Sequence, residues 1–336
     1  MPQRIVFPDR GKVELQHFDL PATGPAEVRV KTHYSLISIG TETTILHQRY
    51  APDSHFAKRF SFPQLKTGVQ AVGEIEQAGA EVSGLAAGDR VFFRMAHGSH
   101  QVLPASAVTC IPAGVDMPSA CWCGLAKTAF RAAWAGKFAA SNQVLIIGAG
   151  PVGQMLVRWA HVENIQHIAV VDQSADRLQH ASRGGSTTLI LGDLGQHLQQ
   201  VSQIAAGLGP ALVVDTTGNP AVFQNALAVA ARFGKVILLG DTGFPQRQCL
   251  SSDLMTKGLT IQAVHESHDR DGWTQGKVDE LFFSYVLSGR FDLSGLMTHE
   301  FTPLECQQAY ALAELHRERA MGILFNWTDS DMTADK

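Results

Sequence analysis

The chain has 336 residues, which favours two domains because single hydrophobic cores rarely grow beyond about 250 to 300 residues. Its hydrophobic share of 45% and charged share of 17% are those of a globular protein and exclude a disordered or fibrous one. The net charge of −4 leaves no basic footprint, so neither nucleic acid nor a membrane surface is expected as a partner.

The apolar runs and the cysteines indicate the cellular location of the protein. No apolar run approaches the roughly 20 residues that span a bilayer, and the first residues lack the apolar segment of a signal peptide. The five cysteines suggest neither a disulfide framework nor paired C-x-x-C metal elements. We therefore expect a cytoplasmic protein with free thiols.

The first third of the chain has the pattern of a small β-barrel domain. Short apolar runs at 28–31, 71–75 and 90–93 are separated by turn signals up to about residue 118. From about Gly124 the apolar period becomes helical, and a helix is predicted over 126–135.

Strands and helices alternate after this helix. The predicted strands cover residues 143–147, 168–172, 188–191, 211–215, 235–239 and 259–264. Such alternation predicts a parallel sheet with crossover helices, and thus an α/β fold. A long helix over 273–287 and a final segment follow, so the expected divisions are 1–118, 119–268 and 269–336.

The turn after the first of these strands carries the strongest functional signal. It is a G-x-G-x-x-G motif formed by Gly148, Gly150 and Gly153, and after Pro151 a helix is predicted from Val152 to about His161. The glycines allow a tight turn, a close approach of a pyrophosphate and close helix packing. This motif predicts a dinucleotide site.

An acidic residue in the right place strengthens that prediction. Asp172 ends the next strand, where a carboxylate binds ribose hydroxyls and repels the 2′-phosphate of NADP, so NAD is the expected cofactor. Gln173 adjoins it, and Arg177 is expected to flank the adenine. The turns after two later strands add further candidates, although their glycines would equally suit plain turns. These candidates are Thr217, Gly218, Leu239 and Gly240.

Several segments together resemble one family. They are residues 84–91, the 148–153 turn, Asp172, and residues 217–220 and 298–304. In this combination the chain is similar to the medium-chain dehydrogenase/reductase family, the zinc alcohol dehydrogenase-like proteins. The resemblance implies a GroES-like barrel as the catalytic domain, a Rossmann domain with a doubly wound parallel sheet, and a last segment that rejoins the barrel. It also implies that substrate binds in a cleft beside the nicotinamide.

The family's zinc ligands are missing from the matching positions. Zinc-dependent members carry Cys-Gly-Thr-Asp and Gly-His-Glu motifs, where this chain has Ile39-Gly40-Thr41-Glu42 and Gly68-Val69-Gln70. Cys123 matches a third ligand and would stand alone, and the four-cysteine structural lobe is absent. We therefore expect no zinc. The pattern is similar to the branch that contains bacteriochlorophyllide a dehydrogenase.

Without zinc, hydrogen-bond donors have to polarise the substrate oxygen. Thr41 matches the position that begins the family's proton relay, and Glu42 beside it is either a base or a partner of Thr41. Gln70 offers an amide donor. His100 is an imidazole that either donates to the substrate oxygen or satisfies a barrel loop.

These features predict an NAD-dependent, zinc-independent oxidoreductase that interconverts a secondary alcohol and a ketone. The alternatives are an enone or quinone reductase that uses NADPH, which Asp172 disfavours, and a nucleotide-binding sensor without catalysis. His265 and His268 flank Glu266 at a spacing that suggests a metal, but no further ligand is evident from sequence. The resemblance also implies a homodimer paired through residues 259–264.

Overall fold

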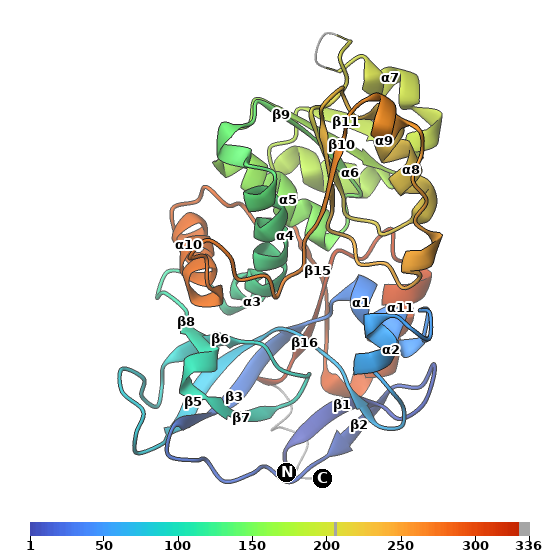
Figure 1. The fold of residues 1–336 in the computed structure, drawn as a ribbon. Coiled ribbons are helices and arrows are strands. Elements are labelled where there is room, and N and C mark those ends of the chain that lie inside the picture. The colour runs from blue at the N-terminus through green and yellow to red at the C-terminus, as the bar shows by residue number, and fades with distance from the viewer. Residues whose placement is uncertain (205–206, 329–336) are drawn as a thin grey trace.

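Two kinds of sheet organise the chain, one parallel and the other largely antiparallel (Figure 1). A computed structural model describes residues 1–204 and 207–328. Within these ranges the antiparallel strands gather at the two ends of the chain, and the parallel strands lie between them in sequence. This arrangement matches the α/β fold class that was expected.

The parallel sheet follows the predicted strands closely. Its strands are β9 (Gln143–Ile147), β10 (His167–Asp172), β11 (Thr188–Leu191), β12 (Leu212–Asp215), β13 (Lys235–Leu238) and β14 (Thr260–Ala263). They lie in the order β11-β10-β9-β12-β13-β14, and every pairing in the sheet is parallel. Because β9 stands in the middle, the strand order reverses beside it, and ligands bind at such switch points.

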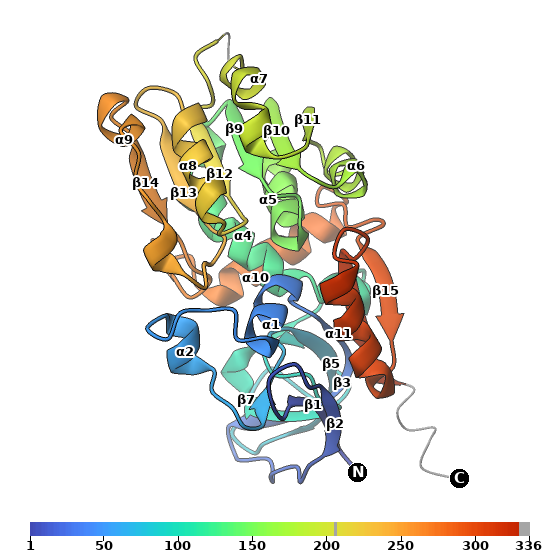
Figure 2. The same cartoon turned by 90° about the vertical axis from the view of Figure 1, so that its right-hand side faces the viewer.

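Helices cover both faces of this sheet (Figure 2). They are α4 (Cys123–Ala135), α5 (Pro151–Val162), α6 (Ala175–Arg183), α7 (Leu198–Ser202), α8 (Pro220–Val229), α9 (Asp253–Thr256) and α10 (Gln275–Leu287). Val144 and Ile146 of β9 pack in the cluster that includes α4, α5 and α10, whereas Leu145 and Ile147 pack with α7 and α8. The two-residue period of the strand therefore builds two separate cores, as a doubly wound fold requires.

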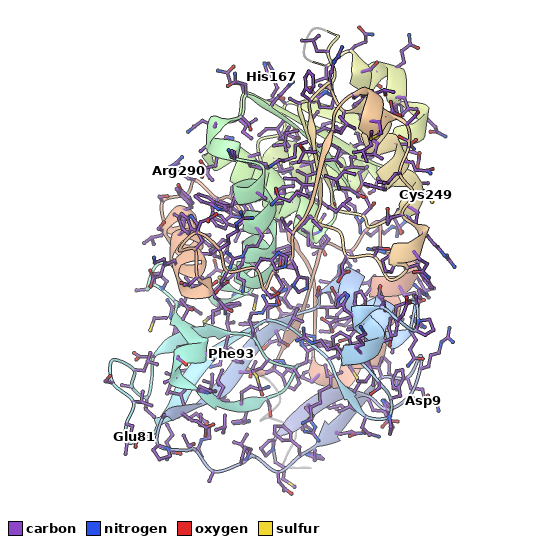
Figure 3. All side chains as sticks on the ribbon, viewed as in Figure 1. Asp9, Glu81, Phe93, His167, Cys249 and Arg290 are labelled. Carbon is purple, nitrogen blue, oxygen red and sulfur yellow. The ribbon has the colours of Figure 1, made fainter. Side chains whose placement is uncertain are left out.

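The other strands form the first domain. They are β1 (Gln3–Phe7), β2 (Glu14–His17), β3 (Glu27–Leu36), β4 (Leu65–Lys66), β5 (Ala71–Ala78), β6 (Arg90–Phe93), β7 (His100–Pro104), β8 (Val108–Cys110), β15 (Met297–Phe301) and β16 (Gly322–Asn326). One sheet runs β15-β16-β3-β5-β6-β8 with β7 also on β3, and a smaller one runs β2-β1-β4. The fully buried Phe93 lies among these strands (Figure 3).

The last segment of the chain pairs with a strand of the first domain. Leu324 of β16 pairs with Leu36 of β3 in an antiparallel ladder that joins residues almost 300 positions apart. The remaining helices are α1 (Ile39–Leu46), α2 (His55–Arg59), α3 (Met117–Ala120) and α11 (Cys306–Leu315). Short 3-10 turns occupy Ala105–Ala107, Phe138–Ala140, Leu194–Gln196, Pro245–Arg247 and Pro303–Glu305.

Within the described ranges, no helix combines the length and apolar character needed to cross a bilayer. The cysteines are free thiols. Cys110 and Cys249 are exposed, and Cys121, Cys123 and Cys306 are buried.

Candidate functional site

The glycine turn between β9 and α5 is tightly packed at Gly148 and Gly153 and open at Gly150. Gly148 has a φ of +94°, and a Cβ on Gly153 would lie 2.0 Å from the Gly148 carbonyl oxygen. Only glycine permits this approach of helix to strand. A Cβ on Gly150, in contrast, would meet nothing nearer than the Arg177 guanidinium at 3.7 Å. The turn therefore leaves the backbone at the start of α5 accessible to an anion.

Local contacts fix the start of α5. Pro151 occupies the first position of the helix, where its missing N–H removes no hydrogen bond, and Val152 follows it, packed against the core. Gln154 is fully buried, and its amide donates to the carbonyl oxygens of Ala149 at 2.8 Å and Arg177 at 2.9 Å. This side chain ties the turn to α6, and nothing in the motif pointed to it.

Asp172 lies beside this turn at the carboxyl end of β10. Its carboxylate accepts a 2.7 Å bond from Ala149 N and a 2.8 Å bond from Ser174 N, one at each oxygen. Each carboxylate oxygen keeps acceptor capacity for a further donor, such as a hydroxyl. Gln173 instead directs its amide toward Asp193, at 3.4 Å.

Two arginines stand close to the turn. The Arg177 guanidinium, which was expected to flank an adenine, lies next to Gly150 and donates to the Arg317 carbonyl oxygen. Burial lowers the pKa of Arg177, and nearby Asp172 opposes that shift. The Arg317 guanidinium reaches to 3.6 Å from where a Cβ on Gly40 would be. Arg317 lies far from the motif in sequence, so no local signal could have identified it.

The two later turns meet at the same edge of the sheet. The Thr217 hydroxyl donates to Asp215 at 2.6 Å. A Cβ on Gly240 would lie 2.4 Å from the Gly218 backbone nitrogen, so the turns after β12 and β13 touch through their glycines. Leu239 is buried in the core. These contacts explain the glycines by packing, and the cofactor contact of the four candidates stays a prediction.

Glu42 is the centre of a buried polar cluster in the first domain, fully enclosed although it carries a carboxylate. It accepts hydrogen bonds from Ser38 N at 2.7 Å, from the Thr67 hydroxyl at 2.8 Å and from the Tyr310 hydroxyl. His97 Nε2 lies 3.1 Å from the same carboxylate. Burial alone would raise the pKa of Glu42, but His97 and the hydrogen bonds from Tyr310 and Ser38 outweigh it and leave the pKa below its ordinary value.

The cluster continues behind His97. The other ring nitrogen of His97, Nδ1, lies 2.7 Å from the Ser35 hydroxyl, which also accepts a 2.9 Å bond from Trp327 Nε1. The network thus connects α1 with β3, the β6–β7 loop, α11 and the end of β16. Glu42 is therefore a positioning group that fixes the helix carrying Thr41, which itself remains partly exposed in the first turn of α1.

His97 is the histidine that lies beside Glu42, and the sequence alone did not identify it. The candidate named from sequence was His100, which begins β7 with its Nδ1 3.0 Å from the Ser99 hydroxyl and its Nε2 3.7 Å from Glu76. These two contacts are with residues outside the Glu42 cluster, and the role of His100 stays a prediction. Only long-range folding distinguishes the two histidines, since both follow β6 within a few residues.

Gln70 joins the first domain to the start of α4. Its Oε1 accepts a 3.1 Å bond from Leu125 N, and a Cβ on Gly124 would come within 2.5 Å of that oxygen. The side chain is completely buried, yet its Nε2 has no hydrogen-bond partner among the residues that the structure describes. A buried amide donor without an acceptor is costly, so a ligand atom that accepted from it would be bound favourably.

Charged side chains surround the neighbouring Cys123. Burial raises the pKa of Asp279 to about 6, opposed by hydrogen bonds that include one from Cys123. Burial, reinforced by Asp279, raises the pKa of the Cys123 thiol well above its ordinary value. Glu266 accepts ion pairs from Arg94 at 2.8 Å and Lys127 at 3.3 Å. The sequence had placed Glu266 only as a residue between two histidines.

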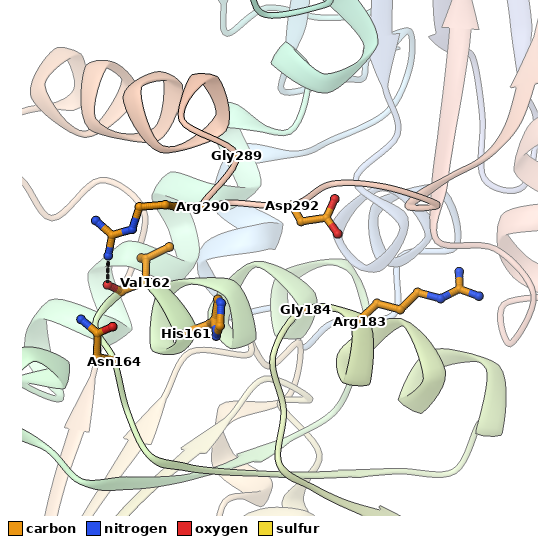
Figure 4. Close-up of a pocket in the computed structure, with 8 residues that line it drawn as sticks. All are labelled: His161, Val162, Asn164, Arg183, Gly184, Gly289, Arg290 and Asp292. Carbon is orange, nitrogen blue, oxygen red and sulfur yellow. Dashed lines mark hydrogen bonds between the residues drawn. The ribbon is translucent and has the colours of Figure 1, made fainter.

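A hollow at the other end of α5 is separate from this site (Figure 4). It is lined by His161, Val162, Asn164, Arg183, Gly184, Gly289, Arg290 and Asp292. Arg290 donates a 2.6 Å bond to the Val162 carbonyl oxygen across it. Because α5 runs from Pro151 to Val162, about 16 Å at 1.5 Å per residue separates this hollow from the glycine turn.

Comparison with known protein families identifies both domains. Residues 24–146 match the model of the alcohol dehydrogenase GroES-like domain, and residues 151–281 match that of the zinc-binding dehydrogenases. The chain belongs to the zinc-type alcohol dehydrogenase-like family of medium-chain dehydrogenases/reductases. It is therefore a member of a family of oxidoreductases, as the sequence resemblance predicted.

Individual relatives agree with this family. The chain is 25% identical to sorbitol dehydrogenase of Arabidopsis thaliana over 94% of its own length and 92% of the relative. It is 32% identical to L-threonine 3-dehydrogenase of Bacillus velezensis, but that match spans 49% of the chain and 46% of the relative.

Solved structures share the family's fold. An oxidoreductase/dehydrogenase of unknown specificity from Escherichia coli aligns with a TM-score of 0.85 at 20% identity, over 97% of this chain and 99% of that one. An Escherichia coli alcohol dehydrogenase complexed with NADH has a TM-score of 0.81 at 19% identity over the same shares. A Sinorhizobium meliloti protein described as a zinc-binding dehydrogenase, bound to NADP, also has 0.81, at 15% identity over these shares.

The residues at the zinc position of this family member do not suit zinc. Ile39 is buried in an apolar cluster and Val69 is aliphatic, so neither supplies a ligand atom. Cys123 is a buried free thiol that lies beside Asp279. Of these three positions, only Cys123 offers an atom that zinc commonly binds.

Proposed function

We propose that this chain is an NAD-dependent oxidoreductase that interconverts a secondary alcohol and a ketone without the family's catalytic zinc. The observation that carries the proposal is the orphaned amide donor of Gln70, which lies next to Cys123 at the start of α4. It stands beside the position where aliphatic residues replace two metal ligands. NAD, when bound, supplies the carbon that accepts and returns the hydride.

The groups around the glycine turn suit the two halves of NAD. The open backbone at Gly150 and the start of α5 would bind the pyrophosphate, and the guanidinium of Arg177 would offset its charge. Asp172, fixed by its bonds from Ala149 and Ser174, would accept from the adenosine ribose hydroxyls. These contacts would bind the cofactor, and none of them selects a particular substrate.

The groups near Gln70 would bind the substrate oxygen and take up its proton. The Gln70 amide would donate a hydrogen bond to that oxygen, and one well-placed donor of this kind lowers the barrier by roughly 3 kcal/mol. The Thr41 hydroxyl, which is partly exposed, would take the alcohol proton while passing its own proton to solvent water, as the hydride moves to the nicotinamide. Glu42 acts through α1, because its carboxylate is enclosed and accepts from Ser38 N, the Thr67 hydroxyl and the Tyr310 hydroxyl within its cluster.

Two other functions differ from this one in testable ways. An enone or quinone reductase would use NADPH, which the carboxylate of Asp172 disfavours. A nucleotide sensor would bind NAD(H) without turnover. The sequence pattern in which the zinc ligands are absent is similar to that of the branch that contains bacteriochlorophyllide a dehydrogenase. This likeness concerns the branch and does not identify the substrate.

A screen of alcohols, polyols and ketones with each pyridine nucleotide tests the proposal. Sorbitol and L-threonine are the first substrates to try, given the names of the relatives. We expect turnover of a secondary alcohol with NAD. Enone reduction with NADPH alone, or NADH binding with no turnover of any compound, would each replace the proposal with one of its rivals.

Thr41 can be tested once a substrate is known. Thr41→Ala is expected to lower kcat by about 100-fold because the proton loses its acceptor, whereas Thr41→Ser keeps the hydroxyl and most of the rate. NADH affinity, measured by fluorescence titration, is expected to stay within about twofold in both variants. Equal kcat for Thr41→Ala and the wild type would remove this residue from the mechanism.

Cys123 provides the test of zinc independence. Cys123→Ser keeps the size of the side chain and a hydrogen bond to Asp279, so we expect kcat within about threefold of the wild type and a loss of about 1 kcal/mol in stability. In a zinc enzyme the same change would remove a ligand and the activity with it. Steady-state rates of the two proteins, each assayed for bound zinc, decide between these outcomes.

We also propose that the protein is cytoplasmic and forms a homodimer. β14 is the edge strand of the parallel sheet, so its outer backbone groups are available to a second copy. Ala263→Pro removes an outward N–H, because Thr260 and Val264 donate inward to the neighbouring strand. Light scattering is expected to give a dimer for the wild type and a monomer for this variant, and an unchanged dimer would exclude this edge.

A further inference from the structure

Three potential metal ligands from three separate segments meet where the two domains touch. His55 begins α2 in the first domain, Asp241 follows β13, and His265 follows β14. One ligand atom from each lies within 4.8 Å of the others. A backbone bond from Ala51 N to the Gly243 carbonyl oxygen, 2.7 Å long, joins the same two segments of the two domains.

The three ligand atoms are near enough for one ion to reach them all, and His55 and Asp241 are in direct contact in its absence. His55 Nε2 and Asp241 Oδ2 are 2.9 Å apart, and the His55 and His265 rings are nearly perpendicular with centroids 6.0 Å apart. In a tetrahedral site with bonds of about 2.1 Å, the ligand atoms lie about 3.4 Å apart. Side chains that are each partly exposed can close the remaining gap by rotation alone.

Neighbouring groups orient the His265 ring in the way that the ring of a metal-binding histidine is oriented. Its Nδ1 lies 2.8 Å from the Ser267 hydroxyl and 3.3 Å from Ser267 N, so Nε2 is the nitrogen left to bind a metal, in the tautomer whose Nδ1–H donates to that hydroxyl. His268 fixes the backbone at the same place, because its Nδ1 accepts a 3.1 Å bond from His265 N. Metal-binding histidines characteristically carry such a partner on the second ring nitrogen.

We propose that His55, Asp241 and His265 bind a divalent transition-metal ion of the zinc class, which ties the first domain to the carboxyl edge of the parallel sheet. Two imidazoles and a carboxylate suit zinc, cobalt or nickel, whereas magnesium and calcium prefer oxygen ligands alone. This set shares no residue with the Ile39, Val69 and Cys123 position. None of the three residues is one on which the proposed function rests.

Calorimetric titration of metal-free protein with Zn²⁺ tests the site. The wild type is expected to bind one equivalent and to gain in Tm, since an ion that binds only the folded state stabilises it. His265→Ala and His55→Ala are each expected to weaken the affinity by at least about 10-fold. The matched control is His167→Ala, because His167 is exposed at the amino end of β10, away from the junction (Figure 3).

Co²⁺ in place of Zn²⁺ identifies the ligand type. Its visible spectrum is expected to show the bands of nitrogen and oxygen ligands without thiolate charge transfer. The Tm of each variant without metal shows whether it folds. Thiolate bands, wild-type affinity in both His265→Ala and His55→Ala, or no stoichiometric binding would each overturn the proposal, and none of these outcomes bears on turnover with NAD.

Discussion

Glu42→Leu is expected to lower the free energy of unfolding by about 3 to 5 kcal/mol. The substitution removes the acceptor of Ser38 N, the Thr67 hydroxyl and the Tyr310 hydroxyl, and it leaves His97 buried without its carboxylate. Each buried donor without a partner costs about 1 to 3 kcal/mol. Glu42→Gln keeps one acceptor oxygen and is expected to cost less, about 2 kcal/mol.

The effect of Glu42 also depends on pH. Because the folded state holds the pKa of Glu42 below its ordinary value of 4.5, the ionised carboxylate favours folding. That contribution is complete above about pH 4.5 and disappears as the pH falls through the lower, folded-state pKa. The stability difference between the wild type and Glu42→Gln is therefore expected to shrink below about pH 4.5.

Urea unfolding at several pH values measures both effects. Glu314→Gln serves as the control, since Glu314 forms ion pairs with His47 and Arg49 near the surface and is expected to contribute less than about 1 kcal/mol. A loss for Glu42→Leu no greater than that for Glu314→Gln would show that the cluster does not hold α1 in place.

The sequence was sufficient where function depends on local backbone geometry. The glycine turn, the strand before it and Asp172 lie within about 30 residues, and each follows from the period of apolar residues and the φ that glycine allows. The structure confirms the strands to within one residue at each end. It also gives the reason for Gly153, whose missing side chain lets the helix touch the Gly148 carbonyl.

The sequence was insufficient where side chains meet across the fold. His97 and His100 have the same chemistry three residues apart, and only the docking of α1 and α11 places the first beside Glu42. The three groups His55, Asp241 and His265 were likewise invisible as a set, because their contact depends on how the domains meet. Pattern reasoning had found His265 but not its partners.

Asp172→Asn is expected to change the preference for NADH over NADPH by about 1000-fold. About 10-fold comes from weaker NADH binding, because a neutral amide is a poorer acceptor for ribose hydroxyls than a carboxylate. About 100-fold comes from stronger NADPH binding, because a carboxylate near a phosphate of charge close to −2 costs several kcal/mol before screening. Fluorescence titration with NADH and with NADPH measures the change in affinity for each cofactor separately.

The neighbouring carboxylate of Asp193 provides the control for Asp172. It accepts a hydrogen bond from Gly195 N at 2.8 Å and lies beyond Gln173, so Asp193→Asn removes the same charge without touching the glycine turn. We expect this control to change the preference by less than about threefold, because exposed charges farther away are screened by salt. A similar shift in both variants would mean that general charge selects the cofactor, and wild-type protein that already prefers NADPH would revive the reductase alternative.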